Sequence, residues 1–134
     1  MDGKKLRVLI VDDSAMIRKI IFRILKEMEV DTIIEAVDGQ DALDKLKTSG
    51  PLDLILSDWN MPRMSGLELV KMVKKTSLFP EFVNTPIIMV TTEAEKGNIL
   101  EALKSGATNY MVKPFPPEAL KQKITDTLAV KAGA

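Results

Sequence analysis

The feature that most constrains the fold is a fivefold alternation between short apolar runs and longer amphipathic segments. The strand candidates occupy residues 6–11, 31–36, 54–56, 86–90 and 107–112, of which the second and the fifth also contain polar residues. Short runs rich in Val, Ile and Leu between turn residues are typical of strands that are buried on both faces of a parallel sheet. Because each run is followed by a helical pattern, the crossovers are expected to be right-handed, with helices on both faces.

This alternation predicts an α/β fold in which one five-stranded parallel sheet has the strand order 2-1-3-4-5. Five strand and helix pairs within 134 residues suit the flavodoxin-like, doubly wound arrangement. The length suits one hydrophobic core, and the sequence shows no internal repeat and no long linker. We therefore expect residues 1–134 to form a single domain.

The segments between the predicted strands carry signals for helix starts and buried faces. The first helix has apolar residues spaced by three and four, namely Ile17, Ile20, Ile21, Ile24, Leu25 and Met28. Asp38 can cap the second helix, and Ser65 with Glu68 forms a capping box for the third. The pattern places Ile99, Leu100 and Leu103 of the fourth helix inward. The last helix is predicted to begin at Pro116-Pro117, to bury Leu120, Ile124 and Leu128, and to fray from Ala129 onward.

Composition excludes several kinds of chemistry. The chain has no cysteine and no histidine, so thiolate metal sites, disulfides, histidine ligands and histidine-based triads are absent. Nineteen basic residues balance nineteen acidic ones, which gives no reason to expect nucleic-acid or membrane binding. The N-terminus lacks the apolar core of a signal peptide, and no apolar run approaches the length of a membrane span. We therefore expect a cytoplasmic protein.

Polar residues follow four of the five predicted strands. Asp12 and Asp13 follow the first strand, and Asp58, Thr91 and Lys113 end the third, fourth and fifth. Parallel strands present their carboxyl ends at one edge, where open α/β sheets bind ligands. Each aspartate alone could be an ordinary helix cap or turn residue. Together the carboxylates favour a Mg²⁺ site, and with the lysine and the hydroxyl they favour a phosphoryl group carried on Asp58.

The motifs at this edge resemble those of the receiver domains of two-component response regulators, and within that family those of free-standing, CheY-type chemotaxis regulators. The matching segments are Val11-Asp-Asp-Ser14, Ser57-Asp-Trp-Asn-Met-Pro62 with Ser65-Gly66, Val90-Thr-Thr-Glu93 and Tyr110-Met-Val-Lys-Pro-Phe115. The resemblance covers essentially the whole chain. It implies a signalling protein rather than an enzyme, with no output domain, which assists its own phosphorylation and dephosphorylation.

The resemblance also implies a role for each matching residue. Asp58 would be the phosphoacceptor, and Mg²⁺ would be bound by Asp12, Asp13, Asp58 and the backbone carbonyl of Asn60. Thr91 and Lys113 would contact the phosphoryl group, and Tyr110 would be an aromatic switch. Asn60 and Glu93 would tune the dephosphorylation rate.

The resemblance further implies partners. A histidine kinase would be the phosphodonor, the flagellar motor switch protein would be the target, and a dedicated phosphatase could remove the phosphoryl group. The protein itself would be a monomer. Ile99, Tyr110 and Lys123 would lie on the partner face, formed by the fourth helix, fifth strand and fifth helix. Ser14 and the Glu95-Lys96-Gly97 segment depart from the best-known chemotaxis members, which leaves the details of partner binding on that helix open.

Two other functions remain compatible with the acidic residues. One is a receiver in a phosphorelay, or a phosphate sink, whose target is not flagellar. The other is a small Mg²⁺-dependent phosphatase that works through an aspartyl phosphate. Phosphatases of the haloacid dehalogenase type place the nucleophile after the first strand, whereas here the single aspartate Asp58 follows the third.

Overall fold

The computed structural model describes residues 5–92 and 96–133 and contains one five-stranded parallel sheet. The strands are β1 (Arg7–Val11), β2 (Thr32–Ala36), β3 (Leu54–Asp58), β4 (Ile87–Thr91) and β5 (Asn109–Val112). The helices are α1 (Ala15–Glu27), α2 (Gly39–Leu46), α3 (Gly66–Lys74), α4 (Lys96–Ser105) and α5 (Pro117–Gly133), with a short 3₁₀ helix, η1, at Pro80–Phe82. The strand order β2-β1-β3-β4-β5 confirms the predicted α/β topology.

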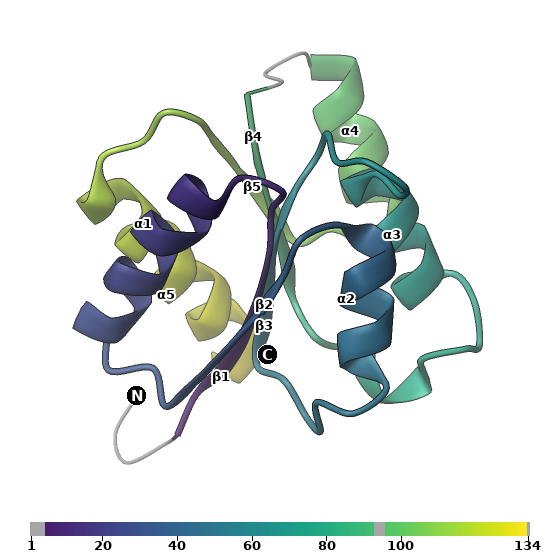
Figure 1. Cartoon of the computed structure of the whole chain (residues 1–134), viewed down its shortest axis with the longest axis horizontal. Coiled ribbons are helices and arrows are strands. Elements are labelled where there is room, and N and C mark those ends of the chain that lie inside the picture. The colour runs from purple at the N-terminus through teal and green to yellow at the C-terminus, as the bar shows by residue number, and fades with distance from the viewer. Residues whose placement is uncertain (1–4, 93–95, 134) are drawn as a thin grey trace.

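The helices form two layers, one on each face of the sheet (Figure 1). Helices α1 and α5 cover one face, where Ile21, Ile24 and Leu25 of α1 join Leu120 and Ile124 of α5 in one hydrophobic cluster. Helices α2, α3 and α4 cover the other face. The central strand β3 is buried along its whole length, as the apolar run of residues 54–56 predicts for its first part.

Local capping explains where three of the helices begin. The hydroxyl of Ser14 accepts a hydrogen bond from the backbone N–H of Ile17, and the carboxylate of Asp38 accepts one from Asp41. Ser65 and Glu68 form the predicted capping box at the start of α3. The caps of α2 and α3 both lie beside the carboxyl edge of the sheet, so they fix the backbone that leads into the site described below.

Three predicted details of the helices are wrong. Leu100 and Leu103 of α4 are 46% and 39% exposed, whereas Ala102 is buried against the sheet. The small residue Ala102 therefore provides the close contact between α4 and the core, and the two larger leucines are exposed to solvent. Ile20 of α1 is likewise exposed. Helix α5 continues to Gly133 instead of fraying from Ala129.

The connection between α3 and β4 contributes to the core. The polar residues of segment 76–85 predict a polar connection, but its two phenylalanines, Phe79 and Phe82, are both buried in the cluster beneath α2, α3 and α4. The ammonium group of Lys74 donates hydrogen bonds to the carbonyl oxygens of Phe82, Val83 and Thr85. The lysine therefore supplies a hydrogen-bond donor to backbone carbonyls in the turn after η1, and that of Phe82 also accepts one from the backbone N–H of Thr85.

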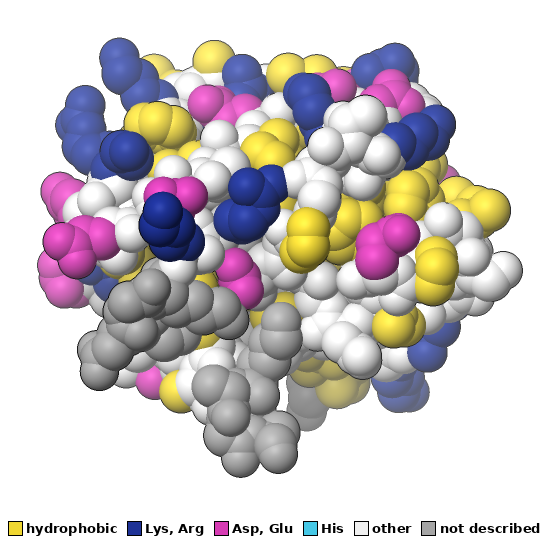
Figure 2. Space-filling model, turned by 90° about the horizontal axis from the view of Figure 1, so that it is seen from below, with side chains coloured by type: hydrophobic (Ala, Val, Ile, Leu, Met, Phe, Trp, Pro, Cys, Tyr) yellow, Lys and Arg dark blue, Asp and Glu magenta, His cyan; other side chains and the backbone are white. Residues whose placement is uncertain are grey.

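Charges of both signs are mixed on the lower face of the molecule. Figure 2 views the molecule from below Figure 1, at the end opposite the carboxyl ends of the strands, and shows basic and acidic side chains interspersed with hydrophobic ones. The face shown in Figure 2 therefore has no extended basic area. Within the described parts of the chain, no helix combines the length and the hydropathy needed to cross a membrane.

Candidate metal centre

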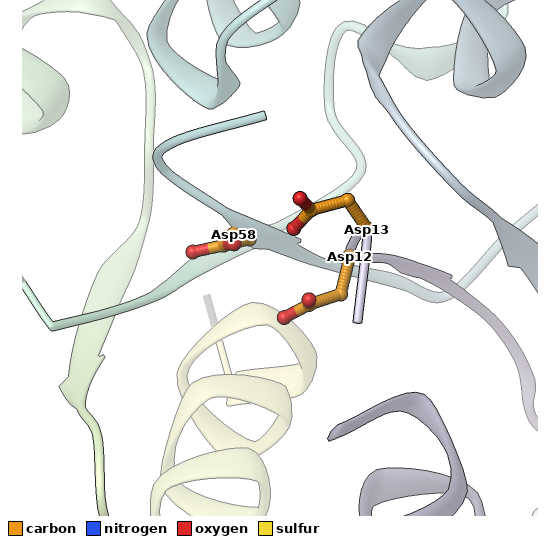
Figure 3. A group of neighbouring side chains, drawn as sticks. All are labelled: Asp12, Asp13 and Asp58. Atoms are coloured by element: carbon orange, nitrogen blue, oxygen red, sulfur yellow. The ribbon is translucent and has the colours of Figure 1, made fainter. Parts of the chain in front are cut away.

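The topology brings three aspartates together at the carboxyl edge of the sheet. Asp12 directly follows β1, and Asp58 is the last residue of β3. Because β1 and β3 are neighbours and Val11 lies opposite Ser57, Asp12 and Asp58 follow side by side. Figure 3 shows the side chains of Asp12, Asp13 and Asp58 gathered at this position. One carboxylate oxygen from each lies within 4.8 Å of the others.

The three carboxylates differ in their exposure to solvent. The side chain of Asp12 is 2% exposed and that of Asp58 is 11% exposed, whereas Asp13 is an exposed residue. Charged carboxylates that lie close together in a partly desolvated place repel one another. A hard divalent cation would remove this repulsion, and a set of oxygen donors open to solvent on one side suits Mg²⁺. The residues present therefore fit the predicted metal.

Lys113 already neutralises part of this charge. Its Nζ atom lies 2.7 Å from Oδ2 of Asp12 and 3.4 Å from Oδ1 of Asp58, so one ammonium group bridges two carboxylates. Its backbone N–H donates a hydrogen bond to the carbonyl of Thr91, which joins the ends of β4 and β5. The Lys113-Pro114 peptide bond is cis.

Asp58 has a perturbed pKa. Burial raises the pKa of the Asp58 carboxyl above its usual range, and the neighbouring charge of Asp12 raises it further. Lys113 and the backbone N–H of Trp59 act in the opposite direction. The Trp59 N–H donates a 2.8 Å hydrogen bond to Oδ1 of Asp58. Among the described residues none donates a hydrogen bond to Oδ2, so this oxygen is open to a metal ion or a reacting group.

Asp12 is held by two residues at the start of α1, Ser14 and Arg18, for which the sequence predicts no contact with this aspartate. Its Oδ1 accepts a hydrogen bond from the backbone N–H of Ser14. Its carbonyl oxygen accepts one of 2.6 Å from the Arg18 guanidinium, which also pairs with Glu35 of β2. The four-residue spacing between Ser14 and Arg18 places both at the start of α1. Helical periodicity alone could not show that Arg18 turns toward the sheet edge.

The remaining predicted residues lie around the carboxylates. Thr91, the last residue of β4, is buried, and Asn60 is exposed in the loop after β3. Tyr110 of β5 is partly buried against the core cluster, with Nζ of Lys123 5.4 Å from the centre of its ring. Ile99 of α4 is also partly buried. Glu93 and Glu95 lie outside the described residues.

Comparison with known proteins agrees with this arrangement. Residues 8–125 match the family model of the response regulator receiver domain. The chain is 43% identical over 128 residues to a chemotaxis protein CheY homolog of Campylobacter jejuni, with 96% of each chain covered. It is 44% identical over 119 residues to the chemotaxis protein CheY1 of Helicobacter pylori, which covers 89% of this chain and 94% of that protein.

Solved structures show the same likeness. The chemotaxis response regulator CheY4 of Vibrio cholerae matches with a TM-score of 0.84 and 37% sequence identity, over 92% of this chain and 99% of that chain. A CheY-like receiver domain protein of Methanospirillum hungatei has the same TM-score at 32% identity, over 97% of this chain and 98% of that chain. The chain therefore belongs to the family of response regulator receiver domains and is similar to the CheY proteins within it.

Proposed function

We propose that this chain is a signalling protein in which Asp58 accepts a phosphoryl group from a histidine kinase. Membership of the receiver family implies a kinase as phosphodonor and a downstream target of the CheY type. The observation that carries the finer proposal is the position of Asp58. Its carboxylate is partly buried, has one open oxygen, and lies between Lys113 and two further aspartates.

The transfer follows from the chemistry of a carboxylate nucleophile. An oxygen of Asp58 attacks the phosphorus of the donor's phosphohistidine, and a P–O bond forms as the P–N bond breaks. The imidazole nitrogen keeps the electron pair of the broken bond. Lys113 pairs with the added negative charge, and the hydroxyl of Thr91 hydrogen-bonds the phosphoryl group. Hydrolysis of the acyl phosphate then releases phosphate and restores the carboxylate, at a rate that Asn60 and Glu93 tune.

Asp12, Asp13 and Asp58 would hold Mg²⁺, together with the backbone carbonyl of Asn60. When bound, the ion supplies positive charge that offsets the charge of the carboxylates and of the phosphoryl oxygens. The protein's own part is to gather the oxygens at one strand edge before the ion arrives. Arg18 and Ser14 contribute by fixing the backbone and carboxylate of Asp12.

Phosphorylation would act by shifting the population of two packings of the same fold. Thr91 would move toward the phosphoryl group, and Tyr110 would turn inward and change the face formed by α4, β5 and α5. Ile99, Tyr110 and Lys123 are the contacts proposed for the target, for which the flagellar motor switch protein is the first candidate. The exposed leucines of α4, Leu100 and Leu103, add apolar surface on the same helix, which supports a protein partner.

Two assays test this function. Acetyl phosphate with Mg²⁺ should load one phosphoryl group per protein, and removal of Mg²⁺ with EDTA should prevent it. A synthetic peptide from a flagellar motor switch protein should then bind the loaded protein more tightly than the unloaded one. Equal binding in both states would contradict the flagellar target and favour the phosphorelay or phosphate-sink alternative.

The phosphatase alternative predicts a different result. A true phosphatase would release many phosphate ions per protein from a generic phosphate ester such as p-nitrophenyl phosphate. The proposed signalling protein should release scarcely any, because each phosphoryl group remains on Asp58 until the acyl phosphate is hydrolysed. Sustained turnover of the ester that is lost in Asp58→Asn would overturn the proposal.

Mg²⁺ affinity should fall as the pH is lowered, because protons compete with the metal for the carboxylates. Burial and Asp12 raise the pKa of Asp58, so this loss should begin at a higher pH than an ordinary aspartate would cause. Trp59 is next to Asp58, and its fluorescence during Mg²⁺ titrations at a series of pH values provides the measurement. An affinity that stays constant throughout the carboxylate range would contradict a metal site made of these acids.

A further inference from the structure

The loop between β3 and α3, residues 59–65, leads from Asp58 to α3. Its base is closed by a backbone hydrogen bond of 2.8 Å from Gly66 to the carbonyl of Trp59. Its far end is reached by Arg63, whose guanidinium donates to both carboxylate oxygens of Asp38, at 2.7 and 3.1 Å. In the described parts of the chain, no other hydrogen bond or ion pair joins residues 60–64 to another element.

Asp38 is well placed to hold this loop. Its side chain is 5% exposed, and it also caps α2 by accepting a hydrogen bond from the backbone N–H of Asp41. The Arg63 guanidinium holds the pKa of Asp38 below its usual range, so the carboxylate stays charged at neutral pH. A paired, planar guanidinium fixes orientation as well as distance.

The backbone of the loop has an unusual conformation at Arg63, and the next residue, Met64, approaches α2 closely. Arg63 has a φ of 66°, a left-handed backbone conformation that residues other than glycine rarely adopt. Gly39, the first residue of α2, lies so close to the loop that a Cβ atom there would be 2.7 Å from Cβ of Met64. Helices α2 and α3 lie side by side on the same face of the sheet (Figure 1). The loop is therefore held to the start of α2 at two adjacent residues, Arg63 through the ion pair and Met64 through this close contact.

We infer that Arg63 and Asp38 form a positioning pair that orders the β3–α3 loop, and through it Asn60, for Mg²⁺ binding at Asp58. Among the described residues, no hydrogen bond or ion pair joins Arg63 or Asp38 to the carboxylates of Asp12, Asp13 or Asp58. Because Asn60 lies between the closed base and the tethered far end, the pair limits where its backbone carbonyl can lie. The inference rests on the proposed Mg²⁺ site, since the loop's order matters for function only if a metal binds there.

The first test measures Mg²⁺ binding by calorimetry. Arg63→Ala should weaken Mg²⁺ binding about tenfold, as is typical when a group that orients metal ligands is removed. Asp38→Asn keeps an oxygen for capping α2 but loses the charge, and it should have the same effect. The double variant should be no weaker than either single one, because both remove the same ion pair. Lys47→Ala is the matched control, since it removes an exposed ion pair with Asp44 near the C-terminal end of α2 and leaves the Arg63–Asp38 pair in place, and it should leave binding unchanged.

The second test does not depend on the metal. Hydrogen exchange of the metal-free protein should show faster exchange of loop amides, including that of Gly66, in Arg63→Ala than in the wild type or in Lys47→Ala. Unchanged Mg²⁺ affinity and unchanged loop exchange in Arg63→Ala would overturn the positioning role while leaving the proposed function intact. Failure of the wild type to bind Mg²⁺ would instead overturn the proposed function.

Discussion

Replacing Lys113 with Met should lower the free energy of unfolding of the metal-free protein by about 3 kcal/mol at neutral pH. The substitution removes the ammonium group that bridges Asp12 and Asp58, at 2.7 and 3.4 Å, and leaves two carboxylates facing each other in a partly buried place. Urea unfolding in the presence of EDTA measures the change. Mg²⁺ should restore more stability to the variant than to the wild type, because the ion replaces the missing positive charge.

The stability difference between Lys113→Met and the wild type should depend on pH in a definite direction. Lys113 lowers the pKa of Asp58, so its loss raises that pKa further. A carboxyl whose pKa is raised in the folded state binds more protons when folded, so stability falls as pH rises from its unfolded pKa to its folded pKa. The difference between Lys113→Met and the wild type should therefore be largest at neutral pH and shrink on acidification. A difference that is independent of pH would contradict the bridging role.

Gly66→Ala should damage both the fold and the metal site. A Cβ atom at Gly66 would overlap the carbonyl oxygen of Asp58 and lie 2.7 Å from Cε of Met89. The start of α3 must then move away from the end of β3, which costs roughly 2–3 kcal/mol by analogy with overpacked cores. Because the clash is with the backbone of Asp58, Mg²⁺ binding should weaken as well. Urea unfolding and a Mg²⁺ titration of the same variant measure both effects.

Gly50→Ala serves as the control for backbone strain alone. Gly50 has a φ of 74°, so alanine there is strained by roughly 1 kcal/mol, but the nearest atom to its Cβ is 3.7 Å away, on Arg7. This variant should lose stability without any change in Mg²⁺ affinity. If Gly66→Ala bound Mg²⁺ as tightly as the wild type, the close approach of Gly66 to the phosphoacceptor strand would have no functional role.

The sequence predicts the sheet and the gathering of acids well for a physical reason. Strand ends are marked by abrupt changes from apolar to polar residues, and a parallel topology brings those ends to one edge. Asp12, Asp58 and Lys113 lie 101 residues apart at the extremes, yet their meeting follows from strand order alone. That these three residues lie close together was therefore predictable without knowledge of side-chain geometry.

Side-chain direction could not be predicted in the same way. In α4 the apolar spacing favoured Leu100 and Leu103 as inward residues, but the helix packs through Ala102, and periodicity does not reveal how closely a helix approaches the sheet. The pairing of Arg63 with Asp38 joins residues 25 apart on different elements, and neither residue belongs to a periodic pattern. Such tethers depend on the path of one loop, which local sequence does not determine.

The most direct test of the central claim is to locate the phosphoryl group after loading with acetyl phosphate and Mg²⁺. Intact and peptide mass spectrometry should show one phosphoryl group, on the peptide that contains Asp58, and none in Asp58→Asn at any Mg²⁺ concentration. Asp13→Asn should be loaded slowly and recover at raised Mg²⁺, because Asp13 is proposed only as a metal ligand. Uptake by Asp58→Asn equal to that of the wild type would contradict the assignment of Asp58 as the phosphoacceptor.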